Sequence, residues 1–204
     1  MNTSGIKAFL KRKQVNISVQ TYLIDALGAM AFGLFASLLI GTIFSTLGEK
    51  TGLPIFTTIS VYAKNATGAA LGVSIAYALK APSLVLFSAA TVGIAGNELG
   101  GPVGALVATS LATELGKLVS RETPVDILRT PGVTIISGVL ASQFVGPGVA
   151  AFMTAFGNLV KTATIMQPFF MGILVSALIG IALTLPISSA ATVSYTHLTL
   201  PTKA

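Results

Sequence analysis

The stretch from Leu84 to Val119 most constrains the fold, because it is apolar everywhere except at its centre. The centre runs from Gly96 to Pro102 and reads Gly-Asn-Glu-Leu-Gly-Gly-Pro. Glycine and proline interrupt a helix and leave backbone groups that need other partners. A carboxylate at membrane depth is costly, so Glu98 beside this broken backbone indicates a binding site rather than a lipid-facing surface.

The whole chain is too apolar for a soluble domain. Its 204 residues are 53% hydrophobic and only 9% charged, and the mean hydropathy is +0.87. An average soluble domain is about 25% charged. The composition therefore predicts an all-α fold, a polytopic membrane helix bundle with broken helices or re-entrant hairpins.

Several classes of chemistry are excluded by residue content. The chain has no cysteine, which rules out disulfides, thiolate metal sites and thiol nucleophiles. The net charge of +6 does not indicate nucleic-acid binding, because the basic residues cluster at the ends of apolar segments, where they act as topology signals. No motif for catalysis or phosphate binding is present in the membrane part. We therefore expect no catalytic residue, cofactor or metal.

Both ends of the chain differ from the middle. Residues 1–20 carry Lys7, Lys11, Arg12 and Lys13 without an acid, and predict an amphipathic N-terminal segment on the cytoplasmic side. Residues 21–192 form the predicted transmembrane domain. Residues 193–204 change composition abruptly and resemble a translated sequencing-adapter read-through. We interpret them as an artefactual tail that contains the single histidine, His197, and that follows a truncated domain.

The apolar segments predict the spans. They are Tyr22–Leu47, Pro54–Leu79 with an interruption at Lys64-Asn65, Ser83–Val119, Gly132–Val160, and about Pro168–Thr192. Basic residues flank Ser83–Val119 on both sides, so this segment is expected to leave and re-enter on the cytoplasmic side as a re-entrant hairpin or a pair of broken helices. The segment Gly132–Val160 has Gly-Pro-Gly at its midpoint and is expected to repeat that form.

An internal repeat is also indicated. A shift of 45 residues places Gly101-Pro102 on Gly146-Pro147 and sets Asn97-Glu98 opposite Ser142-Gln143. Paired apolar segments interrupted by Gly and Pro point to the binding site of a transporter. The common glycines and alanines leave a chance similarity open, and the sequence does not show whether the repeat is parallel or inverted.

The charged side chains allow alternatives. Glu98 could contact a ligand, carry an ion or proton, or cap a helix. Lys64 could pair with an acid such as Glu98, or mark an interfacial break between two shorter helices. Asp25 is expected to reach the interface, and Glu114 to form an ordinary helix-face ion pair with Lys117. The candidate binding residues are Glu98, Asn97, Gly101, Gln143, Ser142 and Lys64, which suit a neutral polyhydroxylated ligand.

Several strings together resemble a known family. They are Ala76–Pro82, Gly96–Gly104, Gly116–Val119, Thr130-Pro131, Val145–Gly148 and Leu183–Ala190. This set is similar to the membrane-embedded IIC component of a bacterial phosphotransferase-system sugar transporter, in the branch described as perfringolysin-regulator-like. The resemblance covers about Tyr22 to Ala191, and family members are longer.

The resemblance implies a function. A IIC component in the bacterial inner membrane binds a sugar outside and presents it inside for phosphorylation by IIB and IIA proteins. This chain would need separate IIB and IIA subunits, since it has no cysteine to hold a phosphoryl group. The resemblance further implies a sugar contact at Glu98 and a possible homodimer. Two alternatives stay open: a membrane ligand sensor without net transport, and an ion- or proton-coupled transporter.

Overall fold

The computed structural model describes residues 12, 13, 18, 20–120, 125–165, 172, 173 and 176. The expectations for most of residues 1–20, for the last apolar segment and for the tail lie outside these residues. Every element in the described part is helical, which confirms the all-α prediction. The elements are η1 Thr21–Ala26, α2 Leu27–Leu34, η2 Phe35–Leu39, α3 Ile40–Thr51, α4 Pro54–Asn65, α5 Thr67–Ala78, α6 Ser83–Val119 and α7 Asp126–Ile165.

The first four elements form one long helix. Its 31 residues, Thr21–Thr51, are continuous, with two π-helical turns at η1 and η2, and they confirm the first predicted span. The Ser18 hydroxyl caps the start by accepting a hydrogen bond of 3.1 Å from the Thr21 amide. The helix ends at Gly52, whose φ of 69° is the left-handed conformation that terminates helices. Pro54 then begins α4 at the position where its missing N–H costs nothing.

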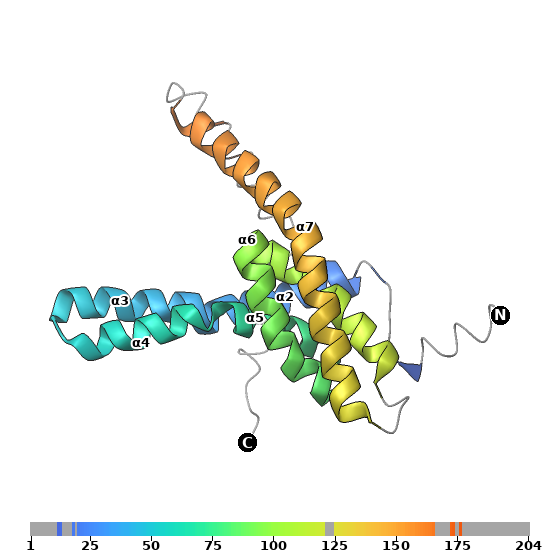
Figure 1. The fold of residues 1–204 in the computed structure, drawn as a ribbon. Helices are drawn as coiled ribbons and strands as arrows, with labels where there is room; N and C mark the ends of the chain where they lie inside the picture. Colours follow the sequence, from blue (N-terminus) through green and yellow to red (C-terminus); the bar gives the residue numbers. More distant parts are fainter. Residues whose placement is uncertain are drawn as a thin grey trace, which may run out of the picture.

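The return helix is interrupted where the sequence predicted. α4 ends at Asn65, and α5 begins at Thr67 after a turn at Ala66. The first helix packs along both pieces, with Gly33 against Ala70 and Gly41 against Lys64. The π-helical turn η2 and the Ala66 turn both lie between these two contacts. The α3–α4 arm therefore projects beyond the bundle from a level where both of its helices are irregular (Figure 1).

Small residues bring α5 and α6 together. A Cβ on Gly68 would lie 2.7 Å from the Ile94 Cα, and a Cβ on Gly93 would lie 2.6 Å from the Gly72 Cα. No side chain larger than hydrogen fits at such distances. The backbones consequently approach as in other membrane helix pairs, where packing rather than the hydrophobic effect drives association.

α6 is a helical hairpin. In a straight helix Val85 and Gly116 would lie about 46 Å apart, yet a Cβ on Gly116 would lie 3.0 Å from the Val85 methyl groups. The chain reverses at Gly101, whose φ of 64° and ψ of −164° belong to a region almost exclusive to glycine. Pro102 then starts the second arm. The predicted hairpin form of this segment is confirmed.

α7 does not repeat the hairpin, so that prediction is wrong. The helix runs from Asp126 to Ile165 and continues through Pro131 and Pro147. α6 has two glycines before its proline, and one of them takes the positive φ. α7 has a single one, Gly146, which stays helical where it packs on Leu99 of α6. The helix also begins at Asp126, six residues before the predicted segment Gly132–Val160, and the Thr130 hydroxyl donates to the Asp126 carboxylate.

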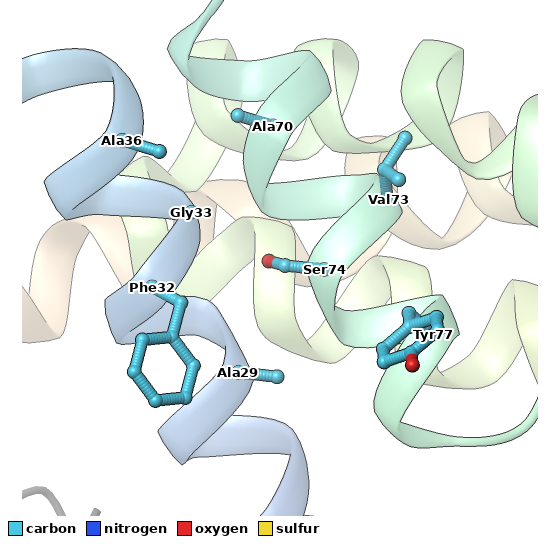
Figure 2. Close-up of a pocket in the computed structure, with 8 residues that line it drawn as sticks. All are labelled: Ala29, Phe32, Gly33, Ala36, Ala70, Val73, Ser74 and Tyr77. Carbon is cyan, nitrogen blue, oxygen red and sulfur yellow. The ribbon is translucent and has the colours of Figure 1, made fainter. Parts of the chain in front are cut away.

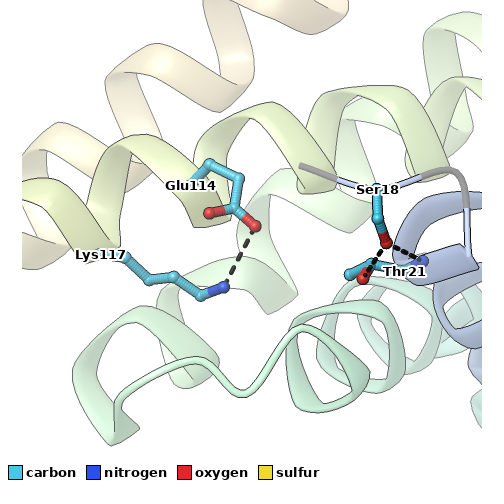
Figure 3. Close-up of polar contacts among 4 residues, drawn as sticks. All are labelled: Ser18, Thr21, Glu114 and Lys117. Carbon is cyan, nitrogen blue, oxygen red and sulfur yellow. Dashed lines mark hydrogen bonds and ion pairs between the residues drawn. The ribbon is translucent and has the colours of Figure 1, made fainter. Parts of the chain in front are cut away.

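The hairpin ends meet the other helices at one end of the bundle, which we call the base. Here the Lys117 ammonium donates to Oε1 of Glu114 at 3.1 Å, as the sequence predicted (Figure 3). The pair is buried rather than superficial, because the two side chains are only 2% and 15% exposed. Tyr22 of the first helix interacts with the same carboxylate. Lys13 donates to the Ser120 carbonyl and ties the N-terminal segment to the base.

The surface matches a membrane environment. Three helices are long and apolar enough to span a bilayer: Thr21–Thr51, Ser83–Val119 and Asp126–Ala155. Folded as a hairpin, α6 offers two arms of about 27 Å, close to the roughly 30 Å of a hydrocarbon core. Aromatic side chains point outward, with Phe87 70% exposed and Phe144 83% exposed. Such side chains suit lipid contact rather than water.

The turn at Gly101 should not tolerate a side chain. Gly101→Ala places a Cβ in a backbone region that L residues avoid, and we expect a loss of about 1–3 kcal/mol of stability. Thermal unfolding in detergent measures the change. Gly148→Ala is the matched control, because Gly148 is helical and a Cβ there meets nothing within 4 Å. Equal melting temperatures for the two variants would contradict a reversal at Gly101.

Replacing only one residue of the Glu114–Lys117 ion pair should strongly destabilise the protein. Lys117→Met leaves the Glu114 carboxylate in a buried site without its cation, and we expect a loss of about 3–5 kcal/mol. The double variant Glu114→Gln with Lys117→Met removes both charges and should recover much of that loss. The measurement is again the melting temperature in detergent. A double variant no more stable than Lys117→Met would contradict this account.

Candidate functional site

The tip of the α6 hairpin packs on the middle of α7. A Cβ on Gly100 would lie 3.1 Å from the Gly146 Cα, and a Cβ on Gly146 would lie 2.8 Å from the Leu99 Cβ. Lower down, Gly138 of α7 packs against Val92 of the first arm. The first arm and the first half of α7 therefore run side by side in the same direction.

This register brings the two predicted polar pairs to one level. Asn97 and Glu98 lie within one turn of the Gly100 contact, and Ser142 and Gln143 lie within one turn of Gly146. The Gly100–Gly146 and Val92–Gly138 contacts join residues 46 positions apart, which is close to the 45-residue offset between the two polar pairs. The similarity stops at the glycine–proline break, beyond which α6 reverses and α7 continues.

The four polar side chains differ in exposure. Glu98 and Gln143 are exposed on the surface of the described part, and Asn97 is half-buried. Ser142 is only 1% exposed, and its hydroxyl donates to the Gly138 carbonyl at 2.9 Å. The exposed carboxylate and amide are available to a ligand, whereas the serine hydroxyl is already committed to its own helix.

The protein surface beside the tip is open. A Cβ on Gly101 would meet no atom within 4 Å, and the same holds for Gly148 just beyond the break in α7. A ligand could therefore approach the backbone at the turn itself. Gly101 thus keeps its place among the candidate residues for its position as well as its conformation.

Lys64 lies outside this group. Its side chain is exposed near the end of α4, and among the described residues no ion pair joins it to Glu98. Its stem packs over Gly41, so that a Cβ on Gly41 would lie 2.9 Å from the Lys64 Cγ. Of the two alternatives for Lys64, the structure supports the break between two helices.

Backbone acceptors near the tip agree with the expectation that glycine and proline leave backbone groups without helical partners. Pro102 and Pro147 have no N–H, so the carbonyls four residues earlier lose their helical donor. Those carbonyls belong to Glu98 and Gln143, the same two residues whose side chains are exposed. The signal was present in the sequence as a proline four residues after each of them.

An apolar groove lies elsewhere, between α2 and α5. It has a volume of ≈ 430 Å³. The side chains of Phe32 and Tyr77 lie on opposite sides of it, with small residues between them (Figure 2). Its lining consists of Ala29, Phe32, Gly33, Ala36, Ala70, Val73, Ser74 and Tyr77. None of these residues carries a charge, and the only polar side chains among them are Ser74, whose hydroxyl donates to the Leu71 carbonyl, and Tyr77, so the groove offers fewer polar groups to orient a sugar than the α6 tip. Within the described ranges, no group of three or more His, Cys, Asp or Glu residues could hold a metal.

Comparison with known proteins gives one family. The family model described as "Phosphotransferase system, EIIC" matches residues 24–199, most of the chain, including the first residues of the predicted tail. Neither the curated proteins nor the solved structures yielded a match. The matched range and the apolar helices show a multi-pass membrane component of a phosphotransferase-system sugar transporter. The chain belongs to the EIIC family of the phosphotransferase system.

Proposed function

We propose that this protein translocates a sugar that binds at the contact between the α6 tip and α7, with Glu98 as the main polar contact. A separate IIB protein, charged by IIA, then phosphorylates the sugar on the cytoplasmic side. The observation that carries the proposal is the common level of Asn97-Glu98 and Ser142-Gln143 on two parallel helix segments beside an open turn.

The chemistry of the tip suits a sugar. An ionised carboxylate accepts hydrogen bonds from neighbouring hydroxyls, and an amide both donates and accepts. The carbonyls of Glu98 and Gln143, released by the two prolines, add further acceptors for hydroxyl donors. This set lacks a cationic group at the tip, so a neutral polyhydroxylated ligand fits it better than an anionic one.

The base of the bundle is the proposed cytoplasmic side. Lys13, Lys80, Lys117 and Arg129 all belong to the segments that meet there. The positive-inside rule assigns such an end to the cytoplasm, and with it the N-terminus. Ser83 starts the first arm at the base, and Glu98 stands about 22 Å further along the helix axis. Glu98 would then lie toward the outer side of the membrane.

Glu98→Gln tests the sugar contact. The substitution keeps the shape of the side chain but removes the charge, and a hydrogen bond to a charged group is worth about 1.5–3 kcal/mol. We expect apparent sugar affinity, measured as uptake with the phosphotransfer proteins present, to fall by about tenfold to a hundredfold. Insertion and melting temperature should stay close to wild type.

Glu49→Gln is the matched control, because Glu49 is also exposed but lies near the end of the α3–α4 arm. It should leave uptake unchanged. Wild-type uptake by Glu98→Gln would remove Glu98 from the mechanism. If uptake stops when the proton gradient is removed but continues in the absence of phosphoenolpyruvate, the protein is instead a proton-coupled transporter. Sugar binding with no uptake by the wild type would indicate a sensor.

A further inference from the structure

The apolar groove between α2 and α5 opens on the outside of the helix pair and has a closed floor (Figure 2). The floor is formed where Gly33 packs on Ala70 and Ser74, since a Cβ on Gly33 would lie only 2.7 Å from the Ser74 Oγ. Exposed Phe32 and Tyr77 stand on either side. The groove belongs to the membrane-spanning helix Thr21–Thr51, so it presents an apolar channel to the bilayer.

Two opposite charges stand at the base end of this groove. The first helix and α5 are antiparallel, and Gly33 lies opposite the turn between Ala70 and Ser74. Asp25 lies eight residues from Gly33, and Lys80 lies eight residues from the midpoint of Ala70 and Ser74, both toward the base. Equal steps bring them to a similar level, about 12 Å from the contact. Both side chains are exposed, and neither forms an ion pair within the described residues.

Lys80 occupies a backbone position that favours glycine. Its φ is 57°, and no other residue except glycine has a positive φ in the described part of the chain. The Ala81 amide donates to the Ala76 carbonyl at 3.0 Å across this turn, as it would at a helix end closed by glycine. Glycine adopts this conformation at lower cost. The local backbone therefore does not account for a lysine here, whereas a role for its ammonium group does.

The two charges decide what occupies the groove. An apolar groove on the outer face of a membrane bundle takes either a lipid chain or another helix. A helix is 10–12 Å across, and one laid along the groove would also cover Asp25 and Lys80 and take both charges out of a polar environment. A phospholipid places its acyl chain in the groove and leaves its polar headgroup beside the two charges.

The signs of the charges select the headgroup. A phosphate is an anion that accepts hydrogen bonds from the Lys80 ammonium, and a primary ammonium donates hydrogen bonds to the Asp25 carboxylate. A headgroup that carries both groups satisfies both residues. An anionic headgroup would satisfy Lys80 alone and would face the negative charge of Asp25.

We propose that the groove binds phosphatidylethanolamine. One acyl chain lies over Gly33 between α2 and α5, the phosphate binds the Lys80 ammonium, and the headgroup ammonium binds the Asp25 carboxylate. The site shares no residue with the proposed sugar site and does not depend on Glu98, so either proposal can fail without the other.

Native mass spectrometry of the whole chain in detergent micelles, titrated with single phospholipids, tests the headgroup. We expect phosphatidylethanolamine to bind about tenfold more tightly than phosphatidylcholine, whose methylated amine has no N–H to donate to Asp25. Phosphatidylglycerol should also bind less tightly. Asp25→Asn should remove these preferences, and Lys80→Gln should weaken the binding of all three lipids by about tenfold. Equal binding of the three lipids by the wild type would overturn the proposal.

Glu49→Gln and Lys50→Gln are the matched controls for the charges, because both residues are exposed in the last turn of α3, far from the groove. They should leave the affinities unchanged. If they reduce lipid binding as much as Asp25→Asn and Lys80→Gln do, the lipid responds to net charge alone and the proposal fails.

Ala29→Phe tests the groove, because its ring takes the place of part of the acyl chain. Displacing about two CH₂ groups should weaken binding about tenfold, whereas Ala151→Phe on the exposed surface of α7 should have no effect. Phosphatidylethanolamine should also raise the melting temperature of the wild type more than that of Ala29→Phe. Wild-type affinity in Ala29→Phe would overturn the groove as the site. Asp25→Asn and Lys80→Gln alter only exposed side chains, so they decide the proposal even if Ala29→Phe does not fold.

Discussion

Close backbone contact at glycines is the constraint on which the rest of the structure depends. Gly93 meets Gly68 and Gly72 between α5 and the first arm of α6, and Gly100 meets Gly146 at the tip. The contacts of Gly93 leave no room for a Cβ, and a Cβ on Gly100 would require Gly146 to shift by a few tenths of an ångström. In a bilayer the lipid is as apolar as the helix faces, so close packing has to supply the association energy that burial supplies in water. The position of the tip on α7 follows from these contacts.

Much of this architecture could be predicted from local chemistry. Ser83–Val119 was expected to start and end on the same side of the membrane, because basic residues flank both of its ends. Its Gly-Gly-Pro centre permits the chain to reverse there. The break after Asn65 followed from a charged and a polar residue inside an apolar run. The prediction of a second hairpin in Gly132–Val160 was wrong, because Gly and Pro permit a chain reversal without requiring one. Packing of Gly146 on Leu99 is a tertiary effect that one segment alone does not reveal.

The site could be predicted less completely than the fold. Spacing alone brought Glu98 and Gln143 to one level, because equal distances along parallel helices preserve register. Spacing could not show that the Ser142 hydroxyl donates to the Gly138 carbonyl, or that Lys64 forms no ion pair with Glu98 among the described residues. Those outcomes depend on rotamers and on the path of α4. Likewise, the burial of the Glu114–Lys117 pair depends on what covers it, including Tyr22 of another helix.

The matched irregularities in the first helix and in its return helix have a mechanical consequence. A single irregular turn in one helix of a pair is braced by the regular partner, but here η2 and Ala66 stand abreast. Bending at η2 and Ala66 therefore breaks few regular helical hydrogen bonds in either of the two helices. The α3–α4 arm can act as a lever with its fulcrum next to Gly68, which packs against Ile94 and Gly93 on the first arm of α6. Force on the far end of the arm would reach the hairpin first through the contact of Gly68 with Gly93 and Ile94.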